Sequence, residues 1–242
     1  MVQTNSKKVL IPIPDKDFDT TEVALTWKIL KQNNIEITFA TANGTIGETD
    51  PLLLIGVIFG QLGAKPKAIV AYHEMQQSNE FLNPIQYENI IPQDYDMLFL
   101  PGGHAKGMRP YLESKLLQSK VVAFFKLNKK VASVCHGTLL LARSIDPETG
   151  KSIVYDYQLT GLPKSLEMLA YAITKWKLND YYKTYTAYMQ DDVETYLKDK
   201  NQFKTGFSSF IPFCVEDRNL TSARWPNDIE KFANLLVDKL KN

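Results

Sequence analysis

Short apolar runs alternate along this chain with segments whose apolar residues recur at helical spacing. The apolar runs cover 9–13, 35–40, 95–100, 131–134 and 213–217, and the helical segments cover about 22–32, 116–127, 138–143, 165–177 and 229–240. Strands that alternate with helices form a parallel sheet with helices on both faces. The pattern therefore predicts an α/β fold.

Two segments add detail to this picture. Residues 43–93 break the alternation with four prolines and an apolar stretch from Leu52 to Leu62, and we expect them to form a cap inserted into a single domain of residues 1–242. In the segment 165–177, apolar side chains recur at the spacing of a half-buried helix: Leu166, Leu169, Ala170 and Ile173.

The composition is that of an ordinary globular protein. Of the 242 residues, 44% are hydrophobic and 23% are charged. The 28 Lys and Arg residues nearly balance the 27 Asp and Glu residues, and the formal net charge is +1. A chain without a basic excess has little attraction for phosphate backbones or anionic lipids, so we expect neither nucleic acid nor a membrane surface as partner.

The sequence also predicts where the protein works. The most apolar run, Leu52 to Phe59, is too short to cross a bilayer. The charged pair Lys7-Lys8 leads straight into a short apolar run, which is typical of a buried first strand and not of a signal peptide. We therefore expect no membrane span and a cytoplasmic location, where Cys135 and Cys214 stay free thiols.

Cys135 is the residue most suited to chemistry. It follows the predicted strand 131–134 directly and is followed by His136, Gly137 and a helix. Ligands bind at the carboxyl ends of parallel strands, and a helix N-terminus favours a thiolate. The amides of His136, Gly137 and the Gly102-Gly103 turn are candidates to bind an oxyanion. The alternative is a packed core cysteine, which is the commoner fate of a lone Cys.

The residues around this cysteine resemble a known family. The segments Val134-Cys135-His136-Gly137, Pro101-Gly102-Gly103-His104 and Thr21-Glu22 are similar to those of the DJ-1/PfpI superfamily. The resemblance implies a flavodoxin-like three-layer sandwich of the class I glutamine amidotransferase type. It also implies that Glu22, at the start of the first helix, hydrogen-bonds the Cys135 thiol.

The electrostatics of that pair can be predicted. A buried carboxyl next to a thiolate should have a raised pKa and donate a hydrogen bond to the sulfur, because two adjacent anions are costly. We therefore expect the Cys135 thiol to titrate below the usual value of roughly 8.5.

The three histidines restrict the reaction. They are His73, His104 and His136, and none follows residue 136. Glutamine amidotransferases of this fold use a histidine far downstream of the nucleophile, so their triad cannot be assembled here. His136 is a candidate base beside Cys135. The alternative is that its ring only packs against the sharp turn, or elbow, between the strand that ends at residue 134 and the helix that follows. His104 continues the Gly102-Gly103 turn and is a candidate for substrate contact.

An acid that orients His136 is also implied by the resemblance. In the branch that contains glutathione-independent glyoxalases, a Glu follows the Cys-His pair after a turn with Thr and Gly. The segment from Leu159 to Leu166 and the residue after it are similar to that stretch, and they place Glu167 at the matching position. A first-turn Glu in a capped helix is the structural alternative.

We predict no required metal and no cofactor. His73, Glu74 and His104 would converge on a metal only by an accident of the cap's folding. The first strand is followed by Pro12-Ile13-Pro14-Asp15, which has no glycine to approach a phosphate. Cys214 lies in an apolar strand and is expected to be a core thiol.

The sequence leaves three functions open. The first is a glyoxalase that converts a small dicarbonyl such as methylglyoxal to a hydroxy acid through Cys135, His136 and Glu167. The second is a cysteine peptidase or amidase-type hydrolase, and the third is a stress-response chaperone or redox sensor. The resemblance also implies a homodimer. The aromatic segment 181–206 cannot be matched to a characterised activity.

Overall fold

A single mixed sheet forms the centre of the protein. The computed structural model describes residues 6–58 and 60–242. The strands follow one another across the sheet in the order β3-β2-β1-β4-β5-β7-β6. Their bounds are β1 Lys8–Pro12, β2 Glu36–Thr41, β3 Ile85–Gln86, β4 Met97–Leu100, β5 Lys130–Val134, β6 Cys214–Asp217 and β7 Leu220–Ala223.

The sheet is parallel except at one edge. All neighbouring pairs among the described strands run parallel apart from β6 and β7, which pair antiparallel. The central strands are buried along almost their whole length, as expected for a parallel sheet covered on both faces. The predicted α/β fold is confirmed.

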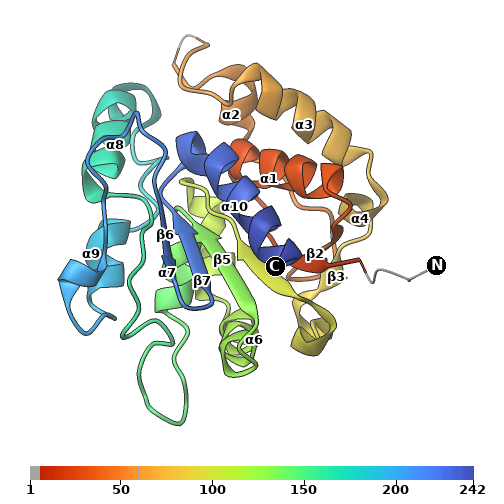
Figure 1. Ribbon diagram of the computed structural model, residues 1–242. Coiled ribbons are helices and arrows are strands. Elements are labelled where there is room, and N and C mark those ends of the chain that lie inside the picture. The colour runs from red at the N-terminus through yellow and green to blue at the C-terminus, as the bar shows by residue number, and fades with distance from the viewer. Residues whose placement is uncertain (1–5, 59) are drawn as a thin grey trace.

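Helices lie on both sides of this sheet (Figure 1). In chain order they are α1 Thr20–Gln32, α2 Pro51–Ile55, α3 Pro66–Gln76, α4 Asn79–Leu82, α5 Arg109–Glu113, α6 Lys115–Lys126, α7 Gly137–Ala142, α8 Lys164–Leu178, α9 Met189–Glu194 and α10 Ile229–Lys241. Helices α1, α3 and α10 pack together on one face, and α5, α6 and α7 cover the other. The predicted long helices are present, with ends one or two residues from the expected positions.

The start of α1 is fixed by its cap. The Asp19 carboxylate accepts hydrogen bonds from the backbone N–H groups of Thr21 and Glu22, at 2.8 and 3.0 Å. Such a cap satisfies amides that the first helical turn leaves unpaired. It also fixes Glu22 in the first turn of the helix, at the carboxyl edge of the sheet.

Residues 43–93, expected to form a cap, contribute to several parts of the fold. Helix α3 packs against α1, and Ile85–Gln86 adds the edge strand β3 beside β2. Before α3 in the chain, α2 is a helix of five residues, and the last residue of the apolar run, Phe59, lies outside the described residues. The stretch around α2 is the part that lies over the carboxyl edge of the sheet.

Helix α8 differs from its predicted packing. Only Glu167 and Thr174 are fully buried on it, and Leu169 and Ile173 are 55% and 39% exposed. The helical period is confirmed, but apart from Leu166, which packs against the core, the apolar face does not enter it. It faces a cavity, which the spacing of residues alone cannot distinguish from a packed interior.

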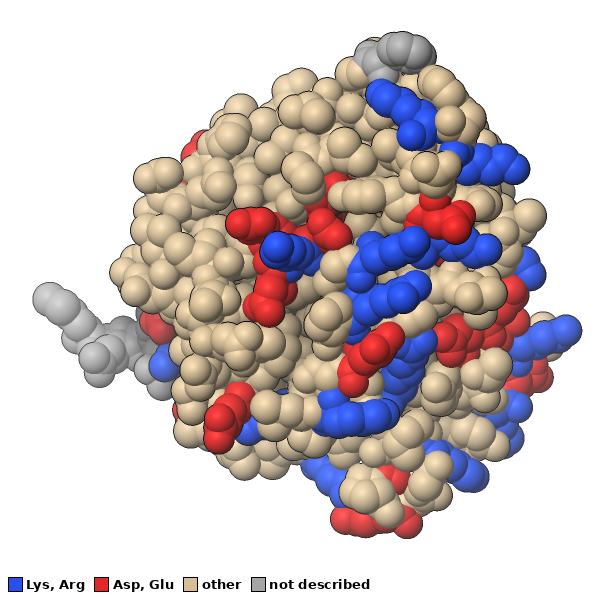
Figure 2. All heavy atoms as spheres, turned by 180° about the vertical axis from the view of Figure 1, so that it is seen from behind, with Lys and Arg blue, Asp and Glu red and all other residues tan. Residues whose placement is uncertain are grey.

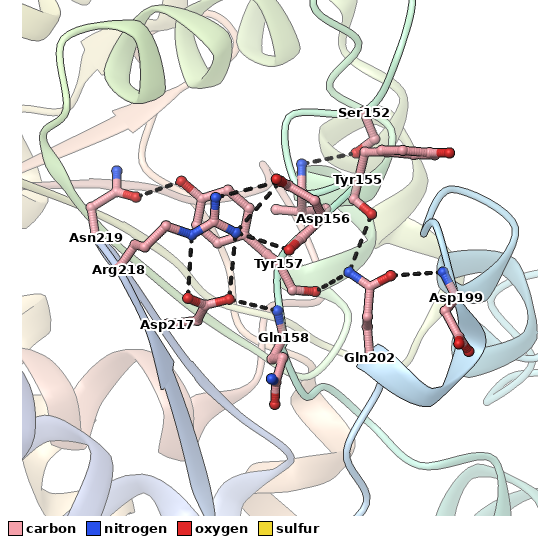
Figure 3. A network of polar contacts seen from close by, with 11 residues as sticks. Ser152, Tyr155, Asp156, Tyr157, Gln158, Asp199, Gln202, Asp217, Arg218 and Asn219 are labelled. Atoms are coloured by element: carbon pink, nitrogen blue, oxygen red, sulfur yellow. Dashed lines mark hydrogen bonds and ion pairs between the residues drawn. The ribbon is translucent and has the colours of Figure 1, made fainter.

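A polar network fixes the segment that leads to α8 (Figure 3). Arg218, at the turn between β6 and β7, donates to the carbonyl of Asp156 at 2.9 Å and lies 3.4 Å from the centre of the Tyr157 ring. Asp217 accepts from the Gln158 amide at 2.8 Å, and Gln202 donates to the Tyr157 carbonyl at 2.9 Å. These contacts tie the segment before α8 to the edge of the sheet.

The surface carries charges of both signs. On the face that Figure 2 shows, Lys and Arg side chains are interspersed with Asp and Glu, and this face has no purely basic surface. Within the described part of the chain, no helix has both the length and the hydropathy to span a bilayer.

Candidate active site

Cys135 lies at the tight turn between β5 and α7. Its φ of 54° falls in the left-handed region, which a residue with a side chain adopts at a cost of about 1–2 kcal/mol. Its amide donates to the Ala223 carbonyl of β7 at 3.2 Å, which holds the turn at the end of the sheet. A strained strand-to-helix turn of this kind presents a nucleophile at the top of an α/β sheet.

Two glycines allow the surrounding backbones to approach this turn. A Cβ on Gly137 would lie 2.1 Å from the Leu100 carbonyl oxygen, and a Cβ on Gly102 would lie 2.7 Å from the backbone nitrogen of His136. Both distances are far below van der Waals contact. The β4 and β5 ends therefore meet only because both positions lack a side chain.

Glu22 faces the cysteine, as the resemblance implied. One of its carboxyl oxygens, Oε2, accepts a hydrogen bond from the Gly102 amide at 2.8 Å. The carboxyl also interacts with the Cys135 thiol, and it is completely buried. The Gly102 amide is thus engaged by Glu22, which corrects the expectation that it would bind an oxyanion.

The charge state of this pair follows from its burial. Burial, and next to it the Asp19 carboxylate, raises the pKa of the Glu22 carboxyl well above its usual range, so Glu22 keeps its proton. Burial also raises the pKa of Asp19, to about 6. The pKa of the Cys135 thiol is raised as well, first by burial and then by the Asp19 carboxylate, since a protonated Glu22 carries no charge. The expectation of a thiol that titrates below 8.5 is therefore wrong for the unliganded site.

His136 and Glu167 continue the line from the thiol. His136 Nδ1 lies 3.5 Å from Cys135 Sγ, and His136 Nε2 lies 3.7 Å from Glu167 Oε1. The other carboxyl oxygen of Glu167 accepts from the Met189 amide at 2.7 Å. The nearby histidines hold the pKa of Glu167 well below its usual range although burial opposes this, so Glu167 is an anion at neutral pH.

His104 approaches the same carboxylate from the other side. Its Nε2 atom also lies 3.7 Å from Glu167 Oε1, and its ring lies 5.2 Å from that of His136 and 5.6 Å from that of Tyr182. Burial lowers the pKa of His104, so its imidazole is neutral at neutral pH. Sequence reasoning placed His104 near substrate but did not link it to Glu167.

These three residues form the cluster that could hold a metal ion. His104, His136 and Glu167 each offer one ligand atom, and the three atoms lie within 4.8 Å of one another. Both Nε2 atoms are buried without a hydrogen-bond partner. Two imidazoles and a carboxylate suit zinc and similar divalent metals. The set differs from the His73, Glu74 and His104 combination considered from sequence, because His73 is exposed on α3 and its ring forms a hydrogen bond with Gln76.

A cavity of about 530 Å³ opens above the cysteine. Among the predicted site residues, Cys135, Glu22, Gly103 and His104 line it. His136 and Glu167 lie behind its wall and are almost completely buried. Neither Gly102 nor Gly137 reaches the cavity surface.

Other residues at the cavity escaped sequence reasoning. Asp50, the N-cap of α2, accepts hydrogen bonds from the hydroxyls of Tyr181 and Tyr182 at 3.0 and 2.8 Å. Thr184 donates to the His104 carbonyl at 2.6 Å. The start of the unmatched aromatic segment therefore packs against His104. The Asp50-Pro51 pair signals a helix start, but no local pattern tells that this helix covers the site.

Cys214 stands apart from this site. It is half-buried on β6 against the core, as the core-thiol expectation required. Burial raises its pKa to about 12.

Comparison with known proteins places the chain among relatives of this architecture. A curated protein of Schizosaccharomyces pombe, named "Uncharacterized protein C14C4.04", is 29% identical over 137 residues, which are 56% of this chain and 50% of that protein. "Glyoxalase 3" of Candida albicans is 25% identical over 135 residues, 56% of this chain and 55% of the relative. The match thus spans only about half the length of these relatives.

The folds agree over more of the chain. The crystal structure of glyoxalase III from Candida albicans superposes with a TM-score of 0.72 at 21% identity and covers 96% of both chains. The sequence model described as "ThiJ/PfpI family-like" matches residues 13–207. These residues include every site residue from Glu22 to Glu167 and also Met189, whose amide donates to Glu167. The chain therefore belongs to the ThiJ/PfpI-like family.

Proposed function

We propose that this protein is a glutathione-independent glyoxalase that converts a 2-oxoaldehyde such as methylglyoxal to the 2-hydroxy acid. The observation that carries the proposal is the continuous line from Cys135 Sγ through His136 to Glu167, with spacings of 3.5 and 3.7 Å. A nucleophile, a base and an oriented acid in this order form a triad for covalent catalysis. The names of the Candida albicans relatives, in sequence and in structure, support this reaction class.

The first step forms a bond between sulfur and the aldehyde carbon. His136 Nδ1 takes the thiol proton as Sγ attacks, and the resulting imidazolium passes the same proton to the aldehyde oxygen to give a neutral hemithioacetal. Since the thiol is neutral in the unliganded site, this proton transfer must accompany the attack. The Glu167 carboxylate stabilises the imidazolium that forms.

The second step moves a proton between adjacent carbons. His136 removes the proton from the former aldehyde carbon to give an enediolate, and the imidazolium returns a proton to the neighbouring carbon. The hydroxyl proton on the first carbon moves to the enolate oxygen, which leaves a thioester of the 2-hydroxy acid on Cys135. Water then cleaves the thioester, so the sum is one dicarbonyl plus one water to one hydroxy acid. One carbon is oxidised and the other reduced, and no external oxidant or reductant is needed.

Lactate formation from methylglyoxal tests the proposal. Purified protein without glutathione should produce lactate, and Cys135→Ala should produce none. Cys214→Ala is the matched control, because it removes the other thiol of the chain and should leave the rate unchanged. Comparable lactate from Cys135→Ala would remove the cysteine from the mechanism.

A cysteine hydrolase is the second candidate. The cavity of about 530 Å³ has room for far more than a few waters, so its size admits a peptide side chain or a small amide. An acyl-enzyme would then form on the same Cys135. Burst release of the leaving group from an activated amide, without lactate from methylglyoxal, would favour this candidate over the glyoxalase.

The redox-sensor and chaperone alternatives make different demands. A buried thiol with a raised pKa is a poor target for peroxide, which favours turnover over sensing. Suppression of client aggregation that survives Cys135→Ser would identify a chaperone activity independent of the site.

We also propose a cytoplasmic homodimer. A single sedimenting species near the 27.5 kDa chain mass would contradict the dimer.

A further inference from the structure

The cavity above Cys135 is much larger than a three-carbon dicarbonyl requires. Its volume is about 530 Å³, within the range of roughly 300–1,000 Å³ typical of sites for drug-sized ligands. Methylglyoxal would fill only the end beside Cys135 and His104. The rest of the cavity has room for a larger part of a ligand.

One wall of this space is the apolar face of α8. Leu166, Leu169, Ala170 and Ile173 recur at helical spacing and all line the cavity. Leu169 and Ile173 keep much of their surface exposed, although their spacing is that of a buried helix face. Apolar surface left open in this way gains free energy when a ligand covers it.

The facing wall is apolar as well. It comes from segments distant in the chain: Leu53, Val57 and Leu62 around α2, and Phe210 and Trp225 before α10. Phe210 is 91% exposed, but its loop is held in place by the buried Arg224, which donates hydrogen bonds to the carbonyls of Ser208 and Ile211. The loop thus holds a large apolar side chain at the cavity rim.

The charges around the cavity narrow the choice of ligand. Its lining includes the acids Asp19, Glu22 and Asp50, and no Lys or Arg is among the described residues that line it. An anionic ligand would meet carboxyls without a compensating cation. A neutral ligand with an apolar tail meets no such penalty.

We propose that the cavity takes neutral 2-oxoaldehydes with a medium-length apolar tail. The aldehyde lies at Cys135, and the tail lies between the apolar face of α8 and the facing wall. This inference rests on the proposed function for the reacting group, whereas the tail site rests on the cavity alone. The preferred substrate is therefore a longer homologue of methylglyoxal.

Binding of unreactive ketones tests the tail site without any turnover. The probes are acetone, 2-pentanone, 2-heptanone and 2-nonanone, measured by calorimetry on the Cys135→Ala variant. Affinity should rise about three- to fourfold per methylene, the gain expected from burying each CH₂. Equal affinities for acetone and 2-nonanone would overturn the inference.

Two variants of α8 locate the tail. Ile173→Asp introduces a charge into the cavity wall and should weaken 2-nonanone binding at least tenfold. Met168→Asp is the matched control, since Met168 is 45% exposed on the same helix but does not line the cavity. Equal losses in both variants would place the tail elsewhere. Decanoate should bind more weakly than 2-nonanone, and tighter decanoate binding would overturn the argument from charge.

The outcomes separate this inference from the proposed function. If ketone affinity rises with chain length but no dicarbonyl is turned over, the apolar site stands and the glyoxalase proposal fails. If methylglyoxal is turned over but ketone affinity is flat, the glyoxalase proposal stands and the apolar site fails. When both hold, kcat/KM should be higher for 2-oxooctanal than for methylglyoxal.

Discussion

His104 and His136 present their Nε2 atoms to the same oxygen of Glu167, each at 3.7 Å. The two imidazoles come from different strand ends, one after β4 and one after β5, and the carboxylate comes from α8. One histidine lines the cavity and the other touches the thiol. Glu167 therefore links the nucleophile to the substrate side of the site.

The charge of Glu167 should matter more than its hydrogen bond. Glu167→Gln keeps an oxygen that can accept from the Met189 amide but removes the negative charge facing both histidines. We expect kcat for the dicarbonyl to fall by about 10²–10³-fold with a smaller change in KM, because the imidazolium loses its counter-charge in the transition state. Steady-state kinetics measure both constants.

A surface acid provides the control for this substitution. Asp191→Asn removes a carboxylate of α9 that pairs with Lys164 on the surface, and kcat should stay within twofold of the original. If Glu167→Gln behaves like Asp191→Asn, the carboxylate has no role in turnover.

Glu22 should make stability depend on pH in a specific direction. Its pKa is raised in the folded state, so the folded protein keeps a proton that the unfolded chain releases above roughly pH 4.3. The stability from this group is present below that pH and is lost as the pH rises toward the folded pKa. Glu22→Gln removes this loss, so its Tm relative to the original protein should increase from pH 5 to pH 8.

Thermal unfolding across that pH range checks the prediction. Glu88→Gln is a suitable control because Glu88 is exposed, and its Tm difference should stay constant with pH. A Tm difference for Glu22→Gln that is also constant would mean that the carboxyl is ionised in the folded protein.

The thiol should react slowly at neutral pH in the free protein. Burial and the Asp19 carboxylate raise the pKa of Cys135, so its alkylation by iodoacetamide should still accelerate at pH 9. Peptide mass spectrometry reads Cys135 and Cys214 in the same sample, and the Cys214 rate should also keep rising. A plateau for Cys135 below pH 8 would instead identify a resting thiolate.

Metal should inhibit the reaction without being required for it. Dialysis against EDTA should leave turnover unchanged, whereas Zn²⁺ should inhibit because His104, His136 and Glu167 can hold it. A metal on Nε2 of His136 leaves the proton on Nδ1, which then cannot accept one from the thiol. Mg²⁺, which prefers oxygen ligands, serves as the control and should have no effect.

A variant assigns that inhibition to the cluster. His104→Gln should raise the zinc concentration needed for half-inhibition by about tenfold or more. Loss of activity on EDTA treatment would show a required metal, and unchanged zinc sensitivity in His104→Gln would place the inhibitory ion elsewhere.

Sequence reasoning predicted those features that depend on local pattern. The alternation of 9–13, 35–40, 95–100 and 131–134 with helices identified the inner strands, because each strand is a short buried run. The elbow at Cys135 followed from its place between a strand and a helix. Glu167 required the family resemblance, since a first-turn Glu has no distinctive local pattern.

The remaining features arise from contacts between distant segments. The α8 period was correct, but whether Leu169 and Ile173 enter a core or a cavity depends on α2 and the loop before α10. The Gly102 amide appeared free in sequence, and only the fold brings Glu22 to it. The raised pKa of Cys135 likewise comes from burial and from the Asp19 carboxylate, more than 100 positions away in the chain.

The fate of the hydrogen in methylglyoxal tests the central mechanism most directly. The reaction is run in D₂O with the original protein, and the lactate is analysed by mass spectrometry for deuterium at its second carbon. Because the proton held on the His136 imidazole can exchange before it is returned, the mechanism predicts that part or all of the lactate carries a solvent deuteron at that carbon, with no lactate from Cys135→Ala. Lactate that forms equally well without Cys135 would contradict the cysteine and proton-transfer mechanism.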